Sequence, residues 1–227
     1  MGPHPPIRQR LTASTAIPRH THAQAYAAVI LSGGYEEAGE FGRRRLGPGD
    51  VAIHPVFSSH MNGVGGREVV LVNLPVAGLR AGFARTADAD AVVRLAETDP
   101  VAAVEFLGEG LTALAAETLD WPDLLALDLN ADPGLDLGAW AGRRGLAAAT
   151  LSRGFGRAYG VTPRRFRQEV KTRRALDSLV EGRSAPLARL ALDSGFVDQA
   201  HMTRAITELT GTSPGAWRRS NGYKAGR

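Results

Sequence analysis

Histidines form the clearest metal-binding pattern in this sequence. His20 and His22 are two residues apart, so on a β-strand they would point to the same face of a sheet. His60 is a third imidazole further along the chain. Three imidazoles can hold zinc, nickel or iron. The alternative is that these histidines form hydrogen bonds or line a ligand pocket without holding a metal.

A second kind of chemistry is indicated by arginine, which is concentrated in the C-terminal half. Residues 131–227 hold 17 basic and 8 acidic side chains, a net charge of +9, whereas residues 1–130 hold 10 and 15, a net charge of −5. This asymmetry suggests two domains, with the basic domain facing a polyanion such as nucleic acid. The alternative is that the arginines solvate helix faces.

The composition excludes several classes of protein. The 227 residues are 44% hydrophobic and include no cysteine, which excludes a disulfide scaffold, a cysteine-ligated zinc finger and a thiol nucleophile. No signal peptide is visible and the longest apolar run, 25–31, cannot span a bilayer, so we expect a cytoplasmic protein without membrane contact. The segment 211–215 matches the G-x-S-x-G nucleophile elbow, but a helix is expected before it instead of a strand. We therefore expect that the protein is not an enzyme.

The elements of the N-terminal part are expected to be short strands followed by helices. The apolar segments 25–31, 51–53 and 68–74, separated by Gly and Pro, predict a small barrel or sandwich over residues 1–87. Residues 88–130 are expected to be a helical segment, in which Asp88 caps a helix through Ala96 and Thr98 or Asp99 caps the next.

An apolar stripe in the second of these helices has coiled-coil-like spacing. Its members recur at intervals of three, four and three residues, and they are Val104, Leu107, Leu111 and Leu114. Such a stripe predicts either a homodimer interface or packing on the β-domain. Residues 130–134 break the helical pattern, and we take them as the linker to the basic half, 131–227.

The basic half contains an internal repeat. Arg153, Gly160 and Pro163 recur 51 residues later as Arg204, Gly211 and Pro214. Each copy is predicted to be a helix, a Gly-containing turn and a second helix, which is the helix-turn-helix pattern. The predicted units are 136–159 and 186–209, joined by a longer helix over 163–181. The alternative is a helical bundle with a duplicated hairpin.

Residues 136–219 resemble the paired helix-turn-helix domain of the AraC family of transcription regulators. The resemblance rests on segments in both copies and in the joining helix: 151–155, 160–163, 173–175, 191–196 and 211–214. It implies an all-α DNA-binding domain, with double-stranded DNA as the partner and RNA polymerase as a further candidate partner.

Helical spacing indicates which side chains could contact DNA. Leu151 and Phe155 are four residues apart and apolar, as are Met202 and Ile206, so both pairs should face the core. Arginine can bind guanine and glutamine can bind adenine in the major groove. From the outward faces and the base-contacting positions implied by the resemblance, the candidates are Ala149, Ser152, Arg153 and Arg157 in the first copy, and Gln199, Ala200, His201, Thr203 and Arg204 in the second.

The two copies differ in how well they are equipped for this task. The run 147–149 is all alanine and supplies neither a capping hydroxyl nor a polar reader, so we expect the first copy to bind its half-site weakly. In the second copy Asp198 is a good N-cap. We expect His201 to contact phosphate or solvent and not to hold a metal.

Residues 18–75 resemble the two motifs of the cupin barrel. The resemblance is carried by His20, His22, Gly33, the run 48–50, Pro55 and His60. It implies that the positions of the three histidines can hold a divalent metal together with a glutamate, a place that Tyr26 takes here. Phe57 replaces a motif glycine, and the asparagine expected after His60 is out of register. His20, His22, Tyr26 and His60 are thus the candidate pocket for an effector or a metal.

Together these features predict an α+β multidomain protein. It has a cupin-like β-barrel with a helical extension, followed by an all-α domain with two helix-turn-helix units. The predicted function is effector-responsive, sequence-specific DNA binding in transcription regulation, with a small molecule or a metal as effector. The alternatives are a metal-dependent, dioxygenase-like cupin enzyme with a helical accessory domain, or a helical adaptor.

Overall fold

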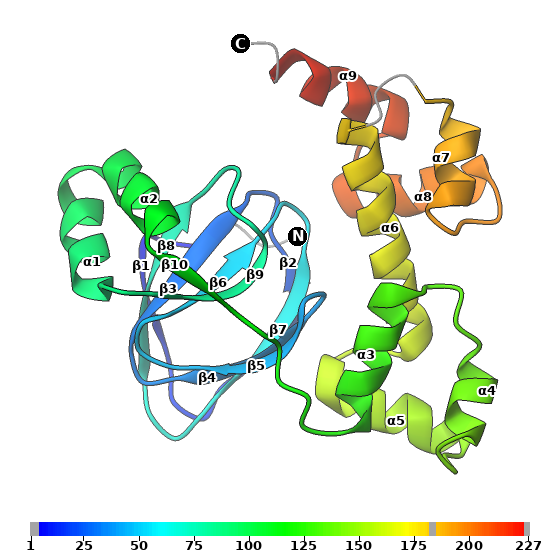
Figure 1. Cartoon of the computed structure of the whole chain (residues 1–227), viewed down its shortest axis with the longest axis horizontal. Coiled ribbons are helices and arrows are strands. Elements are labelled where there is room, and N and C mark those ends of the chain that lie inside the picture. The colour runs from blue at the N-terminus through cyan, green and yellow to red at the C-terminus, as the bar shows by residue number, and fades with distance from the viewer. Residues whose placement is uncertain (1–4, 182–184, 225–227) are drawn as a thin grey trace. The chain divides into compact units, whose positions relative to one another are not determined.

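The computed structural model describes residues 5–181 and 185–224, and the chain divides into two compact units. The first unit is the described part of Met1–Leu124 together with Arg157–Gly160. The second is the described parts of Leu125–Gly156 and Val161–Arg227. Strands dominate the first unit and helices the second, which confirms the predicted fold class (Figure 1).

The strands of the first unit form two antiparallel sheets. The larger has the order β1-β8-β3-β6-β9-β10, and the smaller has the order β2-β7-β4-β5. The larger sheet contains β1 (Arg8–Leu11), β3 (Tyr26–Ser32), β6 (Asp50–His54), β8 (Val69–Pro75), β9 (Gly82–Thr86) and β10 (Leu111–Leu114). The smaller contains β2 (Ala16–Thr21), β4 (Tyr35–Gly39), β5 (Gly42–Leu46) and β7 (Ser59–Val64).

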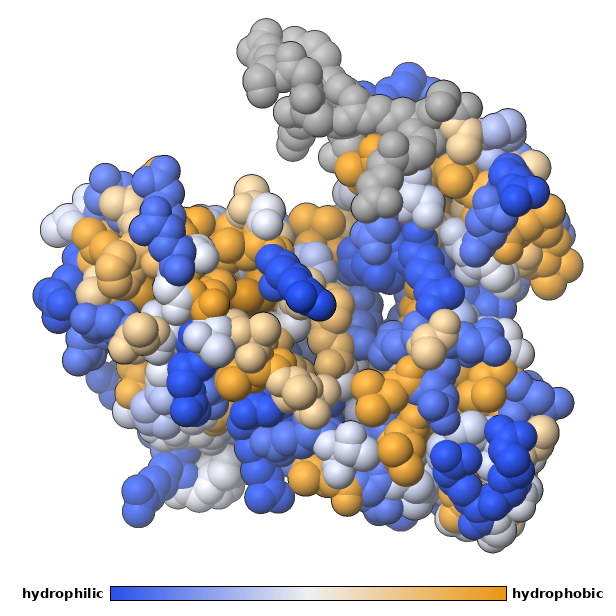
Figure 2. Space-filling model, in the orientation of Figure 1, coloured by the Kyte–Doolittle hydropathy of each residue, from blue (hydrophilic) through white to orange (hydrophobic). Residues whose placement is uncertain are grey.

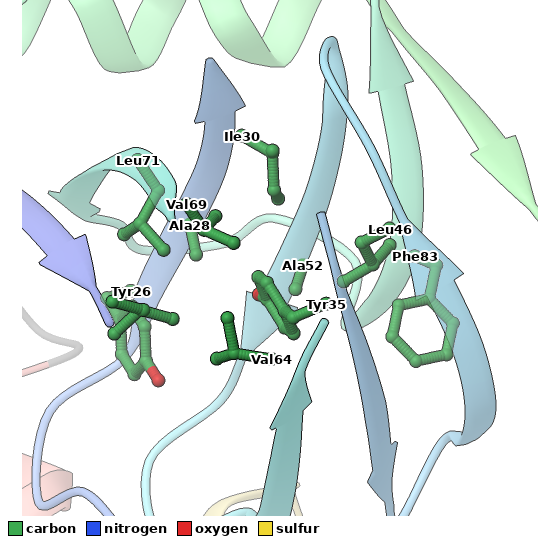
Figure 3. Packing of buried hydrophobic residues seen from close by; sticks show 11 residues of the cluster. Tyr26, Ala28, Ile30, Tyr35, Leu46, Ala52, Val64, Val69, Leu71 and Phe83 are labelled. Carbon is green, nitrogen blue, oxygen red and sulfur yellow. The ribbon is translucent and has the colours of Figure 1, made fainter. Parts of the chain in front are cut away.

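Strand β3 shows how the sequence builds two cores. Successive side chains of a strand point to opposite faces, and an apolar run without alternation is typical of a strand buried on both faces. Ala28 and Ile30 pack in the core that both sheets share (Figure 3). Ala27 and Val29 belong to a second core, between the larger sheet and the helices that cover it.

Helices α1 (Ala89–Thr98) and α2 (Pro100–Glu109) cover that outer face. Both begin as predicted: the Asp88 carboxylate accepts a hydrogen bond from the Ala91 N–H, and the Asp99 carboxylate accepts from Val101 and Ala102. Each cap satisfies backbone donors that the first helical turn leaves unpaired.

The apolar stripe does not lie on a single helix as predicted, and of its two predicted roles the structure supports packing on the β-domain. Helix α2 ends at Glu109 before Gly110, and Leu111 and Leu114 lie in β10, which pairs with β9. Leu107 is fully buried in the second core. The apolar side chains therefore serve packing on the β-domain, and residues 88–130 are only partly helical.

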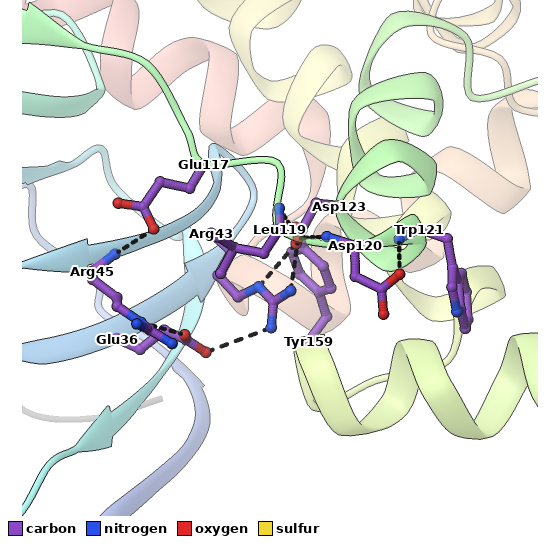
Figure 4. A network of polar contacts seen from close by, with 9 residues as sticks. All are labelled: Glu36, Arg43, Arg45, Glu117, Leu119, Asp120, Trp121, Asp123 and Tyr159. Carbon is purple, nitrogen blue, oxygen red and sulfur yellow. Dashed lines mark hydrogen bonds and ion pairs between the residues drawn. The ribbon is translucent and has the colours of Figure 1, made fainter.

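A polar network holds the segment after β10 against the smaller sheet (Figure 4). Arg43 donates from Nε and Nη2 to the two carboxylate oxygens of Asp123, at 2.9 and 2.7 Å. The same carboxylate accepts from the N–H groups of Leu119 and Asp120 and from the Tyr159 hydroxyl, which belongs to the same unit. Burial raises the pKa of Asp123, but these hydrogen bonds, that of Arg43 first, outweigh it and hold the pKa below its usual range.

The remaining helices give the chain its helix-turn-helix units. They are α3 (Trp121–Ala131), α4 (Leu137–Gly142), α5 (Ala148–Tyr159), α6 (Pro163–Glu181), α7 (Leu187–Asp193), α8 (Gln199–Thr210) and α9 (Pro214–Lys224). Helix α6 has the predicted bounds, and α4–α5 and α7–α8 are the two predicted helix pairs. The segment 211–215 joins α8 to α9, so its Ser213 follows a helix and lies on no nucleophile elbow.

The turns within the two helix pairs are built alike. Gly145 and Gly195 have φ of 63° and 82°, a left-handed conformation that side chains other than glycine adopt at a cost. Leu151, Phe155, Met202 and Ile206 are buried, as their spacing predicts. Within the described residues, no helix is both long and apolar enough to cross a membrane.

Candidate functional site

The second helix of each pair presents the side chains that were predicted to contact DNA. On α5, Ala149, Ser152, Arg153 and Arg157 are all exposed. On the buried side of this helix, the Phe155 ring meets Phe166 of α6 edge to face, with centroids 5.3 Å apart. This packing fixes the rotation of α5 about its axis and directs its polar face to solvent.

Helix α8 carries the corresponding face of the second copy. Gln199, Ala200 and Arg204 are exposed, and His201 and Thr203 are partly exposed. The His201 ring packs edge to face on the buried Phe196, with centroids 5.1 Å apart. This contact holds one side of the ring, and because His201 is partly exposed its contact with phosphate or solvent stays a prediction.

The N-termini of the two helices differ as the sequence predicts. Asp198 is the N-cap of α8, and its carboxylate accepts a hydrogen bond of 2.7 Å from the His201 N–H. Helix α5 begins at Ala148, after Ala147, whose methyl side chain can accept no hydrogen bond. Figure 2 shows hydrophilic and hydrophobic side chains interspersed over the visible face of the helical unit.

The strands of the first unit bring the predicted histidines together in a pocket between the two sheets. His20 of β2 lies opposite His60 of β7, after a register shift in β2 that begins at Ile17. His22 follows β2, and the pocket is lined by all three imidazoles and by Tyr26. The ligand atoms of the three histidines lie within 4.8 Å of one another, so the predicted set can converge on one ion.

Hydrogen bonds orient two of these rings. The His20 Nδ1 lies 2.8 Å from the Pro18 carbonyl oxygen, so this nitrogen donates its proton and Nε2 is left with the lone pair. The Tyr26 hydroxyl and the His60 Nε2 form a hydrogen bond of 3.3 Å. Tyr26 therefore stands where the motif has a glutamate, and it forms a hydrogen bond with His60.

The structure adds Glu37 and His54 to the pocket, and neither was predicted as a site residue. His54 lies opposite Tyr26 across β6 and β3, and Glu37 lies opposite Asn62 across β4 and β7. The Asn62 Nδ2 donates to the Glu37 Oε2 at 3.1 Å, and the His54 Nε2 lies 3.5 Å from the same oxygen. The asparagine that was out of register thus holds a buried carboxyl group.

Burial dominates the electrostatics of this end of the pocket. It raises the pKa of Glu37 to about 8, although hydrogen bonds from Asn62 and Tyr35 act in the opposite direction. Burial, followed by the nearby His22 and His20, lowers the pKa of His54 to about 3. At neutral pH Glu37 and His54 are therefore a neutral acid and a neutral imidazole, in spite of their short separation.

One loop beside the pocket has a strained backbone. Phe57 has φ of 59°, the left-handed region that a bulky residue rarely occupies, and it stands where the cupin motif has glycine. Its N–H donates to the His22 carbonyl oxygen at 2.8 Å and its side chain is buried. Phe57 therefore adopts the left-handed turn conformation that a glycine would favour at this position.

The pattern in the helical unit is confirmed by comparison with known proteins. A family described as a helix-turn-helix domain matches residues 140–220, which include α5 to α8. Residues 140–220 are a helix-turn-helix domain of the AraC type. The chain is therefore a DNA-binding transcription regulator. Its helical region is a DNA-binding domain and not the accessory domain of a cupin enzyme.

Solved structures of low similarity accompany this match. ToxT from Vibrio cholerae is 9% identical, with 93% of this chain and 96% of that chain covered and a TM-score of 0.44. A probable AraC family transcriptional regulator from Rhodopseudomonas palustris is 19% identical over 43% of this chain and 93% of that one, with a TM-score of 0.40. No curated protein matches the chain.

Proposed function

We propose that this transcription regulator reads duplex DNA through the exposed faces of α5 and α8. In helix-turn-helix proteins the second helix of each unit enters the major groove. The observation that carries the proposal is that both second helices have a buried apolar side and an exposed side with hydrogen-bonding groups. Arg153 supplies a guanidinium on α5, and Gln199 and Arg204 supply an amide and a guanidinium on α8.

The roles of these side chains follow from their chemistry. Arg153 and Arg204 can donate two hydrogen bonds to guanine, and Gln199 can pair with adenine in the same bidentate way. Ser152 and Thr203 offer one hydroxyl each, while Ala149 and Ala200 offer apolar contact to a thymine methyl group. Arg157, near the end of α5, is assigned to phosphate, which gives affinity without sequence choice.

The two copies should contribute unequally to sequence choice. The second copy places its readers on a helix that Asp198 caps, whereas the first has Ser152 and Arg153 behind an alanine run. An ordered helix start loses less conformational entropy when its first residues contact a base. We therefore assign the stricter half-site to α8.

The pocket of the first unit is proposed as the sensor site. Its cavity of about 90 Å³ is smaller than the roughly 300–1,000 Å³ typical of sites for drug-sized ligands. A small effector is therefore favoured, and we propose a divalent metal such as zinc, nickel or iron, with His60 among its ligands. His20 and His22 complete the set expected from the sequence.

The experiment that tests the DNA-reading proposal is selection of binding sites from a random duplex pool with the full chain. An enriched motif with one strict and one relaxed half-site supports it. If the recovered duplexes share no base preference, the domain binds only the phosphate backbone and the proposal is contradicted. It stays a prediction that the protein contacts RNA polymerase, forms a homodimer and is located in the cytoplasm.

A further inference from the structure

The pocket contains two overlapping groups of metal-binding side chains. The outer set is His20, His22 and His60, and the inner set is Glu37, His54 and His60. Within each set the ligand atoms lie within 4.8 Å of one another. His20 and His22 are partly exposed, whereas all three members of the inner set are buried.

His60, which the two sets share, has an unused nitrogen. Its side chain is 3% exposed, and Nδ1 has no hydrogen-bond partner among the described residues. Leaving such a group unpaired in a protein interior costs free energy, so this nitrogen is available to a water molecule or an ion. With Nε2–H donating to the Tyr26 hydroxyl oxygen, Nδ1 would keep its lone pair for a metal.

Neighbouring side chains and strands hold the rest of the inner set in place. The Asn62 amide holds the Glu37 carboxyl group at 3.1 Å, which is the kind of outer hydrogen bond that orients a ligating carboxylate. The His54 ring stacks on the His60 ring, with centroids 4.2 Å apart. Three different strands, β4, β6 and β7, supply the three side chains, so both sheets fix their positions.

Charge distinguishes the two sets. The outer set contains three imidazoles and no carboxylate, because Tyr26 stands where a glutamate would complete it. The inner set contains Glu37, and no Lys or Arg is among the described residues that line the pocket. Glu37 can release its proton when an ion binds, and the resulting carboxylate stabilises a dication strongly in a buried site, since the low dielectric strengthens their attraction.

We propose that Glu37, His54 and His60 form a divalent transition-metal site, and that this inner set holds the ion more tightly than the outer one. Nitrogen and oxygen ligands of this kind suit zinc, nickel and iron. With three protein ligands, the ion keeps at least one position for water or another small ligand, which the adjoining cavity can accommodate. The inference deepens the proposed sensor role of the pocket and rests on it.

The test compares Glu37→Gln with His22→Gln in the untagged full chain. The probe is zinc chloride alone, and its affinity is measured by competition with a chromophoric chelator. Glutamine keeps the shape of Glu37 and can accept the same hydrogen bond from Asn62, but it cannot become a carboxylate when an ion binds. His22→Gln is the matched control, since it removes an imidazole that only the outer set uses.

The proposal predicts one zinc ion per chain and an affinity loss of at least about tenfold in Glu37→Gln, the lower end of what losing an outer hydrogen-bond partner costs. His22→Gln should lose less. The visible spectrum of cobalt substituted for zinc should change more in Glu37→Gln than in His22→Gln. Thermal unfolding without metal checks that both variants fold.

Two results would overturn the inner site. One is the absence of stoichiometric zinc binding by wild type, and the other is an affinity loss in His22→Gln that equals or exceeds that in Glu37→Gln. DNA binding by the same samples is measured in parallel. Because the helix-turn-helix domain does not contain Glu37, DNA binding in Glu37→Gln separates failure of the metal site from failure of the regulator assignment.

Discussion

The Asp198 carboxylate accepts a hydrogen bond from the backbone N–H of His201 at a distance of 2.7 Å. This bond satisfies one of the donors that the first turn of α8 would otherwise leave unpaired. Gln199 is the first residue of the helix, so the cap sits beside the first of the proposed base-reading side chains. The first turn of α8 thus carries both the helix cap and the first of the proposed base-reading side chains.

Asp198→Ala should destabilise the helical unit by about 1 kcal/mol, the usual effect of removing an N-cap. Urea unfolding followed by circular dichroism measures the loss. Asp198→Ser is the control, because serine can accept the same hydrogen bond, and it should retain most of the stability. Equal losses in both variants would mean that Asp198 acts through its charge and not as a cap.

Arg204→Ala should relax sequence choice at one or two base pairs of a single half-site. A bidentate contact between arginine and guanine gives roughly 1–3 kcal/mol of discrimination against the wrong base. Site selection from a random pool, repeated for wild type and variant, reports the change. An unaltered selected motif would remove Arg204 from the reading face.

Arg157→Ala should weaken binding to all sequences about equally. The exposed guanidinium near the end of α5 is assigned to phosphate, so its loss should also reduce the slope of affinity against salt concentration by about one phosphate contact. Affinities for a selected site and for a scrambled duplex, each at two salt concentrations, provide the measurement. A loss confined to the selected site would reassign Arg157 to base contact.

Much of the helical unit could be predicted because the sequence repeats itself. The recurrence of Arg153, Gly160 and Pro163 as Arg204, Gly211 and Pro214 marks the same helix, left-handed glycine and helix start twice. Local rules decide each of these features: the cap, the glycine turn and the i, i+4 apolar pair. Such features depend little on distant residues.

Arg43→Met should destabilise the first unit by about 3 kcal/mol. The Arg43 side chain is 14% exposed and the Asp123 side chain 2%, so the variant leaves a buried carboxylate without its charged partner. The low end of the usual range of about 3–5 kcal/mol applies, because Asp123 keeps hydrogen bonds from Leu119, Asp120 and Tyr159.

The matched control for this variant is Arg45→Met in the neighbouring part of β5. Arg45 is 76% exposed and pairs with Glu36 at 3.6 Å, so its loss should cost less than about 1 kcal/mol. Urea unfolding curves of both variants give the comparison. Similar midpoints for the two would show that the Arg43–Asp123 pair contributes no more than a surface ion pair.

Acid should destabilise wild type more steeply than Arg43→Met. The pKa of Asp123 is held below its usual value, so its contribution is present above a pH of about 4 and is lost as the pH falls through the folded-state pKa. His54 and His60 are buried as neutral rings and add an acid-sensitive contribution that both proteins share. Unfolding free energies from pH 6 to pH 2 test the difference, and parallel curves would exclude a role for the pair.

The first unit was harder to predict because sheets join residues that are distant in the sequence. The spacing of Leu107, Leu111 and Leu114 fits a helix, yet Gly110 ends α2 and the last two leucines pair with β9. Tertiary packing overrides the local pattern there.

Glu37 was missed for a related reason. The cupin motif places the glutamate at the position of Tyr26. In the structure the carboxyl group is that of Glu37, which lies on another strand and reaches the pocket through the pairing of β4 with β7. Strand alternation could have placed His54 in the pocket, since it shares a face of β6 with Ala52, a member of the core between the sheets.

The central claim is that this chain binds duplex DNA through an AraC-type helix-turn-helix domain. Titration of the full chain with a selected duplex at 50 and 200 mM salt tests it most directly. Positive side chains that displace phosphate counterions predict specific binding that weakens steeply, by about 10³–10⁵-fold for six to ten phosphate contacts. Binding that is absent at low salt, or that does not change with salt, would contradict the account.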